Sequence, residues 1–414
     1  MSRAVVIGAG IGGLTAAVAL ERRGWQVTVL ERAERLEPVG SGLAIASNAL
    51  KALDTIELGD EVRRLSRLQG RGGVRTSRGR WLIHTTEEKA AARYGDSGAI
   101  MLRATLMDLL ADRVGDLRLG TTVTGVDAEK GVVSTVTGVD AEKGVVSTVT
   151  GVDAQNSRED TPKGVAGGEF EAELVVAGDG INSAMRRTLF PGHPDPVYSG
   201  VTAWRVLVPN PGGLVVESTE SWGRGLVFGV HALAGDIVYL YATDLAPAGE
   251  PHGDERAGLL RRFGDWHRPI PALLESARPE NILRNDVYYL GTPLPAMHRG
   301  RVALIGDAAH PMTPNLGQGA CQAIEDAIVL AANARNLPAY TEARLARTSK
   351  VVARSTKLCR ATTIRNPLAV RLRDMGMSLA GRLSSDLMLR SMDEVLGWTP
   401  PESAWTGQGR DARV

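Results

Sequence analysis

Four short, largely apolar runs, each followed by glycine or glutamate, indicate the buried strands of a parallel sheet. They occupy residues 4–7, 27–30, 174–177 and 301–305. Continuous apolar runs of this kind are typical of strands that helices cover on both faces. Residues 197–245 instead alternate polar and apolar positions in short stretches broken by Gly, Pro and Asn, which predicts a mostly antiparallel sheet. We therefore predict an α/β fold in which a Rossmann-like domain is interrupted by a second, β-sheet domain.

The remaining segments predict the helices and loops around these strands. Apolar residues at helical spacing indicate helices at 47–53, 103–110 and 254–277. Residues 71–83 alternate like a hairpin, whereas residues 84–98 are charged and contain glycine, which favours a loop. After Gln322 the pattern is mostly helical, and three prolines mark its breaks: Pro338, Pro367 and Pro400.

A tandem repeat interrupts the predicted cofactor domain. The sequence TVTGVDAEKGVVS fills residues 122–134, returns unchanged at 135–147, and begins again at 148–154. Its alternation, followed by a turn at Glu-Lys-Gly, predicts a lengthened β-ribbon produced by duplication; the alternative is an edge that binds a partner. Identical units leave the strand register ambiguous. The polar residues 155–168 predict a loop.

The order of these segments predicts a discontinuous domain arrangement. The nucleotide-binding domain is expected to consist of three separate segments of the chain, and the β-sheet domain of two. A helical segment would complete the chain. The expected boundaries are 1–70, 100–180 and 285–355 for the first domain, 71–99 and 181–284 for the second, and 356–414 for the C-terminal helices.

Composition narrows the class of protein without defining its chemistry. The 414 residues are 43% hydrophobic and 23% charged, with a net charge of +1, so a polyanionic partner such as nucleic acid is not expected. Only Cys321 and Cys359 are present, which favours a reducing compartment and no disulfide framework. The apolar stretch after Arg3 resembles a signal sequence, but its glycines have the spacing of a phosphate-binding turn. We therefore expect a cytoplasmic protein without a membrane span.

The first candidate site is a G-x-G-x-x-G turn between a strand and a helix. Gly8 would permit the tight turn, Gly10 would let a pyrophosphate approach the backbone, and Gly13 would let the helix pack closely on the strand. The helix N-terminus offers free N–H groups to the phosphate. Glu31, at the end of the second strand, can accept hydrogen bonds from a ribose. This motif predicts a bound FAD or NAD rather than NADP.

Two further motifs complete a recognisable set. They are AGDGINSAMRR at 177–187 and GDAAHPMTPNLGQGACQAIEDA at 306–327. Together with the first motif and the order of segments, they resemble the single-component (class A) FAD-dependent aromatic hydroxylases, which are the p-hydroxybenzoate hydroxylase-like flavoprotein monooxygenases. Within that family the sequence is most similar to the branch of salicylate hydroxylase, phenazine-1-carboxylate hydroxylase and zeaxanthin epoxidase.

The resemblance implies a set of residues that bind FAD. On the adenosine side, Arg32 would join Glu31, and the three glycines would hold the pyrophosphate. Asp179 would lie near the pyrophosphate and in the path of the nicotinamide cofactor, or cap a helix, or do both. The ribityl chain and the flavin ring would be held by Gly42, Arg103, Asp307, Pro314, Gly317, Gln318 and Gly319. Arg103 has the alternative of a solvated helix start, and Asp307 that of a turn residue.

The substrate side is less well defined by the resemblance. Arg205 would anchor a substrate carboxylate or hold the flavin in position; the alternative is a salt bridge elsewhere. With Pro314 and Gly317 it forms the candidate catalytic set. Trp204 is expected in the core and His310 in a structural role, and no general base stands out. Further candidate lining residues are His84, Val206, Phe228, Tyr239 and Met312.

The reaction implied by the resemblance consumes NAD(P)H and O2. NAD(P)H would reduce FAD, and a flavin C4a-hydroperoxide would transfer one oxygen atom to an electron-rich carbon of an aromatic substrate. No metal is expected, and the protein would be a monomer or a homodimer. A flavin-dependent reductase, dehydrogenase or epoxidase on the same scaffold is one alternative. A non-catalytic protein that binds flavin or ligand is the other.

Overall fold

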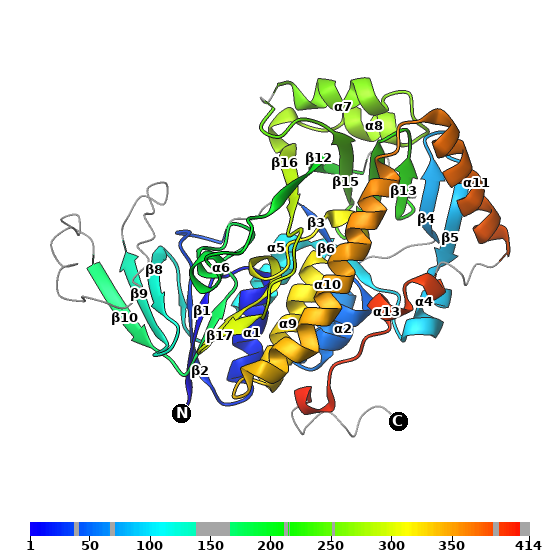
Figure 1. The fold of residues 1–414 in the computed structure, drawn as a ribbon. Helices are drawn as coiled ribbons and strands as arrows, with labels where there is room; N and C mark the ends of the chain where they lie inside the picture. Colours follow the sequence, from blue (N-terminus) through cyan, green and yellow to red (C-terminus); the bar gives the residue numbers. More distant parts are fainter. Residues whose placement is uncertain are drawn as a thin grey trace.

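A computed structural model provides the structure of the chain (Figure 1). It describes residues 1–36, 41–66, 71–137, 166–210, 214, 216–250, 253–383 and 389–405. Two large sheets dominate these residues, and the long helix α10 (Leu337–Thr362) runs from the region of one sheet to that of the other.

The first sheet is the predicted parallel sheet. All four predicted strands are present, and their pairs are parallel; only β17 joins antiparallel. Because β1 and β11 are apolar at nearly every position, they lie buried between helices. In spatial order the strands are β17 (His298–Arg299), β18 (Val302–Leu304), β11 (Leu174–Ala177), β1 (Arg3–Ile7), β2 (Gln26–Leu30) and β7 (Leu117–Arg118).

Helices from both ends of the chain surround this sheet. Helix α1 (Ile11–Glu21) packs against α9 (Gly319–Ala332) and α5 (Arg103–Ala111). The short strands β3 (Gly42–Ile45) and β6 (Ala99–Leu102) pair beside them. The other helices of this half and of the C-terminal region are α2 (Ser47–Asp54), α3 (Gly59–Leu65), α6 (Ala184–Leu189), α11 (Pro367–Leu383) and α13 (Asp393–Leu396).

The second sheet has seven strands and is antiparallel except where β13 joins β4. Its alternation gives it two different faces. Trp204, Val206 and Val208 pack against α7 (Glu255–Phe263) and α8 (Ile270–Glu275), which cover the sheet at the top of Figure 1. We call the opposite face, which meets β6, the inner face. The strands in spatial order are β16 (Leu283–Tyr289), β12 (Val197–Pro209), β15 (Ile237–Leu245), β14 (Val227–Leu233), β13 (Thr219–Trp222), β4 (Arg71–Thr76) and β5 (Trp81–Thr86).

The loop prediction for residues 84–98 was wrong. Strand β5 continues to Thr86, and helix α4 (Glu87–Tyr94) follows. The Thr86 hydroxyl caps this helix by accepting a hydrogen bond from the backbone N–H of Lys89, and Gly95 ends it in the left-handed conformation. The segment 254–277 also differs from the prediction, because two helices, α7 and α8, occupy it in place of one.

The first unit of the repeat, with the first three residues of the second, forms a β-hairpin at the start of the predicted ribbon. Strands β8 (Thr121–Asp127) and β9 (Val132–Thr137) pair antiparallel, and Asp127 accepts hydrogen bonds from the N–H groups of Glu129 and Lys130 in the turn. The predicted ribbon beyond residue 137 lies outside the described residues. Strand β10 (Ala166–Glu171) then pairs with β9, so the last three residues of the loop predicted at 155–168 belong to a strand.

Candidate functional site

The glycine turn after β1 has the geometry that its spacing predicted. Gly8 has φ +97°, and a Cβ added there would lie 2.5 Å from the carbonyl oxygen of Gly178. A Cβ on Gly13 would lie 2.0 Å from the carbonyl oxygen of Gly8, so the fold requires glycine at both positions. A Cβ added to Gly10, at the N-terminus of α1, would meet no other atom within 4 Å. Gly10 therefore leaves space for an anion beside the free N–H groups of the helix.

Glu31 lies at this turn and helps to shape it. Its Oε2 accepts a hydrogen bond from the N–H of Ala9 at 2.8 Å, and Oε1 accepts one from the N–H of Ala33 at 3.0 Å. A carboxylate has about four acceptor positions, so two bonds leave capacity for ribose hydroxyls. Arg32, next to it, is exposed.

The motif at 177–187 holds the motif at 306–327 in position through hydrogen bonds. Asp179 accepts hydrogen bonds from the Ser183 hydroxyl at 2.6 Å and from the N–H of Met185 at 3.1 Å. Ser183 is the N-cap of α6, so Asp179 assists the cap from outside the helix. Arg186, which is buried, donates hydrogen bonds to the carbonyl oxygens of Ala308 at 3.0 Å and Asp307 at 3.3 Å. The second motif thereby fixes the turn that carries Asp307.

Three charged residues from distant parts of the sequence lie close together at that turn. Desolvation by the surrounding protein raises the pKa of the Asp307 carboxyl, and the nearby His310 and Arg103 oppose this rise. Because Asp307 is exposed to solvent, the rise in its pKa is limited. Burial lowers the pKa of Arg103, Asp307 opposes this, and the nearby Arg205 adds to it. Within the described ranges the Arg103 backbone N–H donates to the Ser41 carbonyl oxygen at 3.0 Å, but no group accepts a hydrogen bond from the Arg103 guanidinium. An exposed acid and a free guanidinium are thus available to a ligand.

The loop after Asp307 presents its backbone on one side and buries its side chains on the other. Pro314 and Gly317 are exposed, Gly317 has φ +61°, and helix α9 begins at Gly319, where an added Cβ would meet nothing within 4 Å. The Gln318 side chain points away from the exposed backbone of Pro314, Gly317 and Gly319, which we call the opening. It is buried and accepts hydrogen bonds from Asn48 at 3.0 Å and Gln322 at 3.1 Å. Its side chain is therefore structural, and only its backbone borders the opening.

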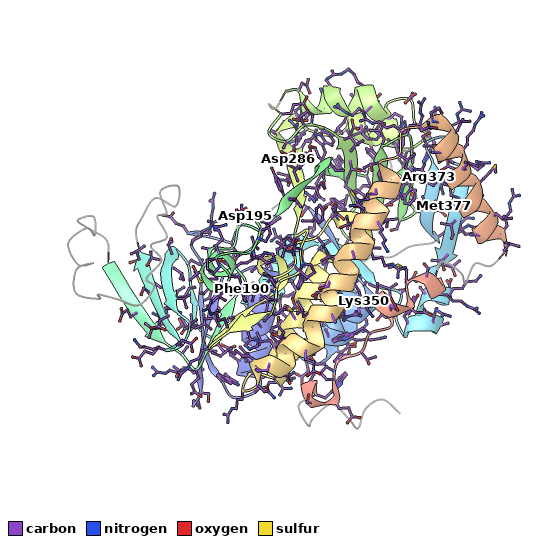
Figure 2. The ribbon with its side chains drawn as sticks, in the orientation of Figure 1. Phe190, Asp195, Asp286, Lys350, Arg373 and Met377 are labelled. Carbon is purple, nitrogen blue, oxygen red and sulfur yellow. The ribbon has the colours of Figure 1, made fainter. Side chains whose placement is uncertain are left out.

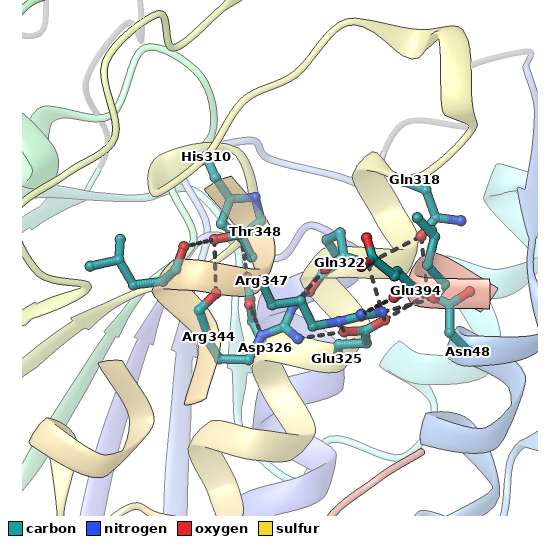
Figure 3. Close-up of polar contacts among 12 residues, drawn as sticks. Asn48, His310, Gln318, Gln322, Glu325, Asp326, Arg344, Arg347, Thr348 and Glu394 are labelled. Atoms are coloured by element: carbon teal, nitrogen blue, oxygen red, sulfur yellow. Dashed lines mark hydrogen bonds and ion pairs between the residues drawn. The ribbon is translucent and has the colours of Figure 1, made fainter. Parts of the chain in front are cut away.

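Beneath this loop lies a buried network of charges (Figure 3). Arg344 of α10 is fully buried and donates hydrogen bonds to Glu325 and, at 2.7 Å, to Asp326. Asp326 also accepts from the N–H of Gly306 at 2.9 Å and bonds to His310 Nε2 at 2.5 Å. Burial would raise the pKa of Asp326, but His310 and Arg344 outweigh it and lower the pKa to about 2. The network holds both ends of the Asp307 turn, in agreement with a structural role for His310.

Sequence reasoning assigned no role to three members of this network. Glu325 and Asp326 are adjacent acids in an otherwise apolar helix, and Arg344 is a cation in the next helix. Acids in a helix that is buried on all sides need paired cations. This pairing rule was the signal that could have identified the three residues.

The inner face of the second sheet carries a group of polar and aromatic side chains near Arg205. Arg205 is half-buried and donates a hydrogen bond from Nη1 to the Asn285 amide oxygen at 3.1 Å. Tyr239 packs on Gly42, where an added Cβ would lie 2.4 Å from its ring. The His231 ring stacks on Tyr239 and Tyr241, with ring centres 6.2 and 5.6 Å apart. Four functional groups from β12, β14 and β15 therefore share this face.

His231 and Tyr241 were not among the predicted site residues. Burial lowers the pKa of His231 to about 4, so the ring is neutral near pH 7, and its Nδ1 is buried without a hydrogen-bond partner among the described residues. The Tyr241 hydroxyl donates a hydrogen bond to Glu220, which also accepts one from Trp222 Nε1 at 2.8 Å. The alternation of β14 and β15 would have placed His231 opposite Tyr239, but only once their pairing was known.

Several predicted lining residues lie elsewhere. Val206 and Phe228 belong to the core beneath α7, where Phe228 contacts Phe263 with ring centres 5.0 Å apart. Trp204 lies in the same core, as expected. His84 is exposed on β5, at the opposite edge of the sheet from β12, because the sheet orders its strands differently from the sequence. Met312 is half-buried in the loop after Asp307.

Comparison with known proteins identifies this arrangement. A family model described as "FAD binding domain" matches residues 1–206 and 292–355. The chain belongs to this family of FAD-dependent monooxygenases. It is 35% identical over 413 residues to aurachin C monooxygenase/isomerase of Stigmatella aurantiaca, covering 96% of this chain and 98% of the relative. The fold is similar to the crystal structure of Klebsiella pneumoniae HpxO complexed with FAD and uric acid, with a TM-score of 0.81 and 25% sequence identity over 97% of each chain.

A third relative agrees with this assignment. The 2-heptyl-3-hydroxy-4(1H)-quinolone synthase of Pseudomonas aeruginosa is 31% identical over 341 residues, which cover 79% of each chain. The fold class predicted from the sequence is thereby confirmed, and FAD is the cofactor of the family. The residues present fit FAD, because the open space at Gly10, the exposed Asp307 and the free Arg103 form polar positions that a long anionic cofactor would fill.

Proposed function

We propose that this flavin monooxygenase uses NAD(P)H and O2 to hydroxylate a small or polycyclic aromatic substrate. The observation that carries the proposal is the closeness of Arg103 to both Asp307 and Arg205. It brings the turn after β18 and the start of α5, which carry the cofactor-binding groups, next to the inner face of the second sheet. The proposed division into cofactor and substrate domains is supported by the two large sheets, with β16 (Leu283–Tyr289) extending the second sheet past the proposed boundary at residue 285. A cytoplasmic location and a monomeric or dimeric state remain part of the proposal.

The cofactor is proposed to lie along the edge formed by the three motifs. The N-terminus of α1 and Gly10 would bind its pyrophosphate, with Asp179 nearby, and Glu31 and Arg32 its adenosine. Asp307 and Arg103 would bind the ribityl chain and phosphates, and Gly42 would border the ring. Once bound, FAD supplies the redox chemistry by which NAD(P)H activates O2.

The residues at the reacting end are proposed to orient groups and to stabilise charge. Pro314, Gly317 and Gly319 present backbone at the start of α9, whose free N–H groups would stabilise negative charge on the reduced ring. Arg205 would hold a polar or anionic group of the substrate. The Tyr239 and Tyr241 rings would pack against its aromatic plane and exclude water from the reacting atoms.

The inner face supports a nitrogen heterocycle as the substrate. It offers a neutral imidazole, with a ring nitrogen that no described residue pairs, beside two tyrosines and one arginine. Such groups match a planar ring that carries both N–H and carbonyl groups. Relatives of this chain are named for urate, a 4(1H)-quinolone and 6-hydroxynicotinate, all of which are heterocycles of this kind.

A substrate panel would test this proposal. Purified protein is assayed for NADH and NADPH oxidation with urate, a 4-quinolone, 6-hydroxynicotinate and salicylate, in air and under anaerobic conditions. The expected result is oxidation stimulated by a heterocycle and a product heavier by one oxygen atom derived from labelled O2. Continued turnover of substrate without O2 would instead identify a reductase or dehydrogenase. A protein that purifies with NAD and no flavin would contradict the cofactor assignment.

A further inference from the structure

One helix carries five of the eleven large apolar side chains that are exposed in the described part of the chain. Five large apolar side chains on α11 are between 59% and 75% exposed. Their spacing of four, three, four and four residues places them in one stripe along the helix. They are Leu368, Leu372, Met375, Leu379 and Leu383.

The opposite side of α11 is fully used in packing. Val370 is buried, Met377 packs beside Leu82 of β5, and a Cβ on Gly381 would lie 3.0 Å from the Leu82 carbonyl oxygen. Arg373 lies over the Trp222 ring at 5.3 Å and donates hydrogen bonds to the backbone carbonyls of Ala361 and Gly223. Figure 2 shows α11, with Arg373 and Met377 labelled, at the outer edge of the second sheet. The apolar stripe is therefore not needed to hold α11 against the second sheet.

A contiguous apolar surface of this kind indicates an interaction site. Single exposed apolar residues are common on soluble proteins, but large contiguous patches mark contacts with proteins or membranes. Among the described residues eleven large apolar side chains are exposed, and α11 alone holds five of them. A helix with apolar residues on two opposite sides is typical of burial, and the described residues cover only one of these sides of α11.

The charges beside the stripe favour an anionic partner. Arg371 and Arg382 are exposed on the same border of the stripe, and neither forms an ion pair within the described ranges. Asp374, the acid in the described part of α11, is bonded to Arg373 at 2.9 Å. The exposed side of the helix thus consists of apolar residues, and its charged residues are both arginines.

The same charges disfavour pairing with a second copy of the chain. In a parallel helix pair each arginine would lie level with its own counterpart. In an antiparallel pair centred between Gly376 and Met377, Arg371 would lie level with Arg382 of the other helix. Both arrangements place like charges together, which is unfavourable on helix surfaces.

We propose that α11 binds the surface of an anionic lipid bilayer. The apolar stripe would enter the boundary between headgroups and acyl chains, with the helix parallel to the bilayer plane, while Arg371 and Arg382 contact the anionic headgroups. This docking goes beyond the proposed reaction and does not depend on it. It would bring the enzyme to the phase in which apolar aromatic compounds accumulate.

Vesicle co-sedimentation of the full-length, FAD-loaded protein tests the proposal. We expect binding to vesicles of equal parts phosphatidylglycerol and phosphatidylcholine, and much weaker binding to pure phosphatidylcholine. The double variant Leu372→Ser/Leu379→Ser should lower the partition coefficient by about tenfold or more, because apolar burial drives the insertion. Arg371→Gln/Arg382→Gln should remove the preference for anionic vesicles and the salt dependence of binding. Flavin content and NAD(P)H oxidation in solution should not change.

The matched control is Val197→Ser, which removes an apolar side chain that is 45% exposed on β12. It should bind vesicles like the unaltered protein. Failure of the unaltered protein to bind anionic vesicles would overturn the proposal. So would analytical ultracentrifugation that shows a dimer dissociated by Leu372→Ser/Leu379→Ser, since the stripe would then be a self-association surface.

Discussion

The two polar regions of this enzyme use their hydrogen-bonding groups in opposite ways. Beneath the loop at 306–319, Arg344, Glu325 and Asp326 are buried and bonded to one another or to backbone. On the inner face of the second sheet, Arg205 has one amide partner, and His231 Nδ1 has none among the described residues. In the first region the polar groups form hydrogen bonds within the protein, whereas in the second they remain available to a ligand.

The energetic reason for the difference is desolvation. A buried charge without a partner is strongly unfavourable, so the network beneath the loop is stable only when every member is present. It can therefore fix one backbone shape for Gly306 and the turn that follows it. Unpaired polar groups at a ligand site are tolerated because the ligand completes them. The comparison predicts large stability effects in the first region and mainly binding effects in the second.

The largest effect is expected from Arg344→Met. This change removes the cation that Glu325 and Asp326 share, while Glu325 keeps Arg347 and Asp326 keeps His310. Removal of one partner of a buried ion pair destabilises proteins by about 3–5 kcal/mol. We expect a fall of that size in the free energy of unfolding, measured by urea denaturation, together with weaker flavin retention. The control is Lys350→Met on an exposed position of the same helix, which should change stability little. Equal stabilities of the two variants would show that the network does not support the loop.

Asp307→Ala should separate cofactor binding from folding. Asp307 is exposed and its carboxylate makes no hydrogen bond with another described residue, so the apoprotein should keep its stability. Flavin content should fall sharply, and the stabilisation that a bound ligand gives, about 2.7 kcal/mol at a hundredfold excess over Kd, should be lost. The absorbance ratio of flavin to protein measures the first effect and thermal unfolding with added FAD the second. Asp195→Ala, another exposed acid, is the control; full flavin content in Asp307→Ala would refute its proposed role.

The same difference explains what the sequence could and could not predict. Gly8, Gly13 and the four parallel strands obey local rules of spacing and sterics, so the cofactor half was predictable from contiguous motifs. Even there, Gln318 was placed near the flavin as a residue of the motif, while its side chain serves the buried network. A motif gives the position of a residue but not the direction of its side chain.

The inner face was less predictable because strand pairing creates it. Val206 and Phe228 were expected to line the site, but their register places them under α7. His231 faces Tyr239 only through the pairing of β14 with β15, a contact that depends on tertiary structure. Similarly, the helix at 87–94 follows from a Thr86 cap and a Gly95 end, two local signals that the charged composition of the segment obscured.

Arg205→Gln should lower catalytic efficiency without releasing the flavin. Hydrogen bonds to charged groups contribute about 1.5–3 kcal/mol, so the loss of one should reduce kcat/KM by about tenfold to a hundredfold, mostly through KM. Steady-state kinetics with the best substrate of the panel measures this, and Arg78→Gln on the exposed turn between β4 and β5 is the control. If flavin content falls in parallel with kcat/KM, Arg205 holds the cofactor in place of the substrate.

The smallest effect is expected from His231→Gln, and it depends on pH. Burial lowers the pKa of His231 from its usual 6.5 to about 4. Between these values the unfolded chain takes up a proton that the folded chain does not, so this residue favours folding fully above pH 6.5, and its contribution is lost as the pH falls towards 4. His231→Gln should therefore lose less stability between pH 7 and 5 than the unaltered protein, as measured by urea unfolding at both pH values. His84→Gln, which changes an exposed histidine on β5, should retain the original pH dependence. Parallel pH profiles for the two variants would mean that His231 is solvated, and the inner face would then lack the buried imidazole on which the proposed heterocycle site depends.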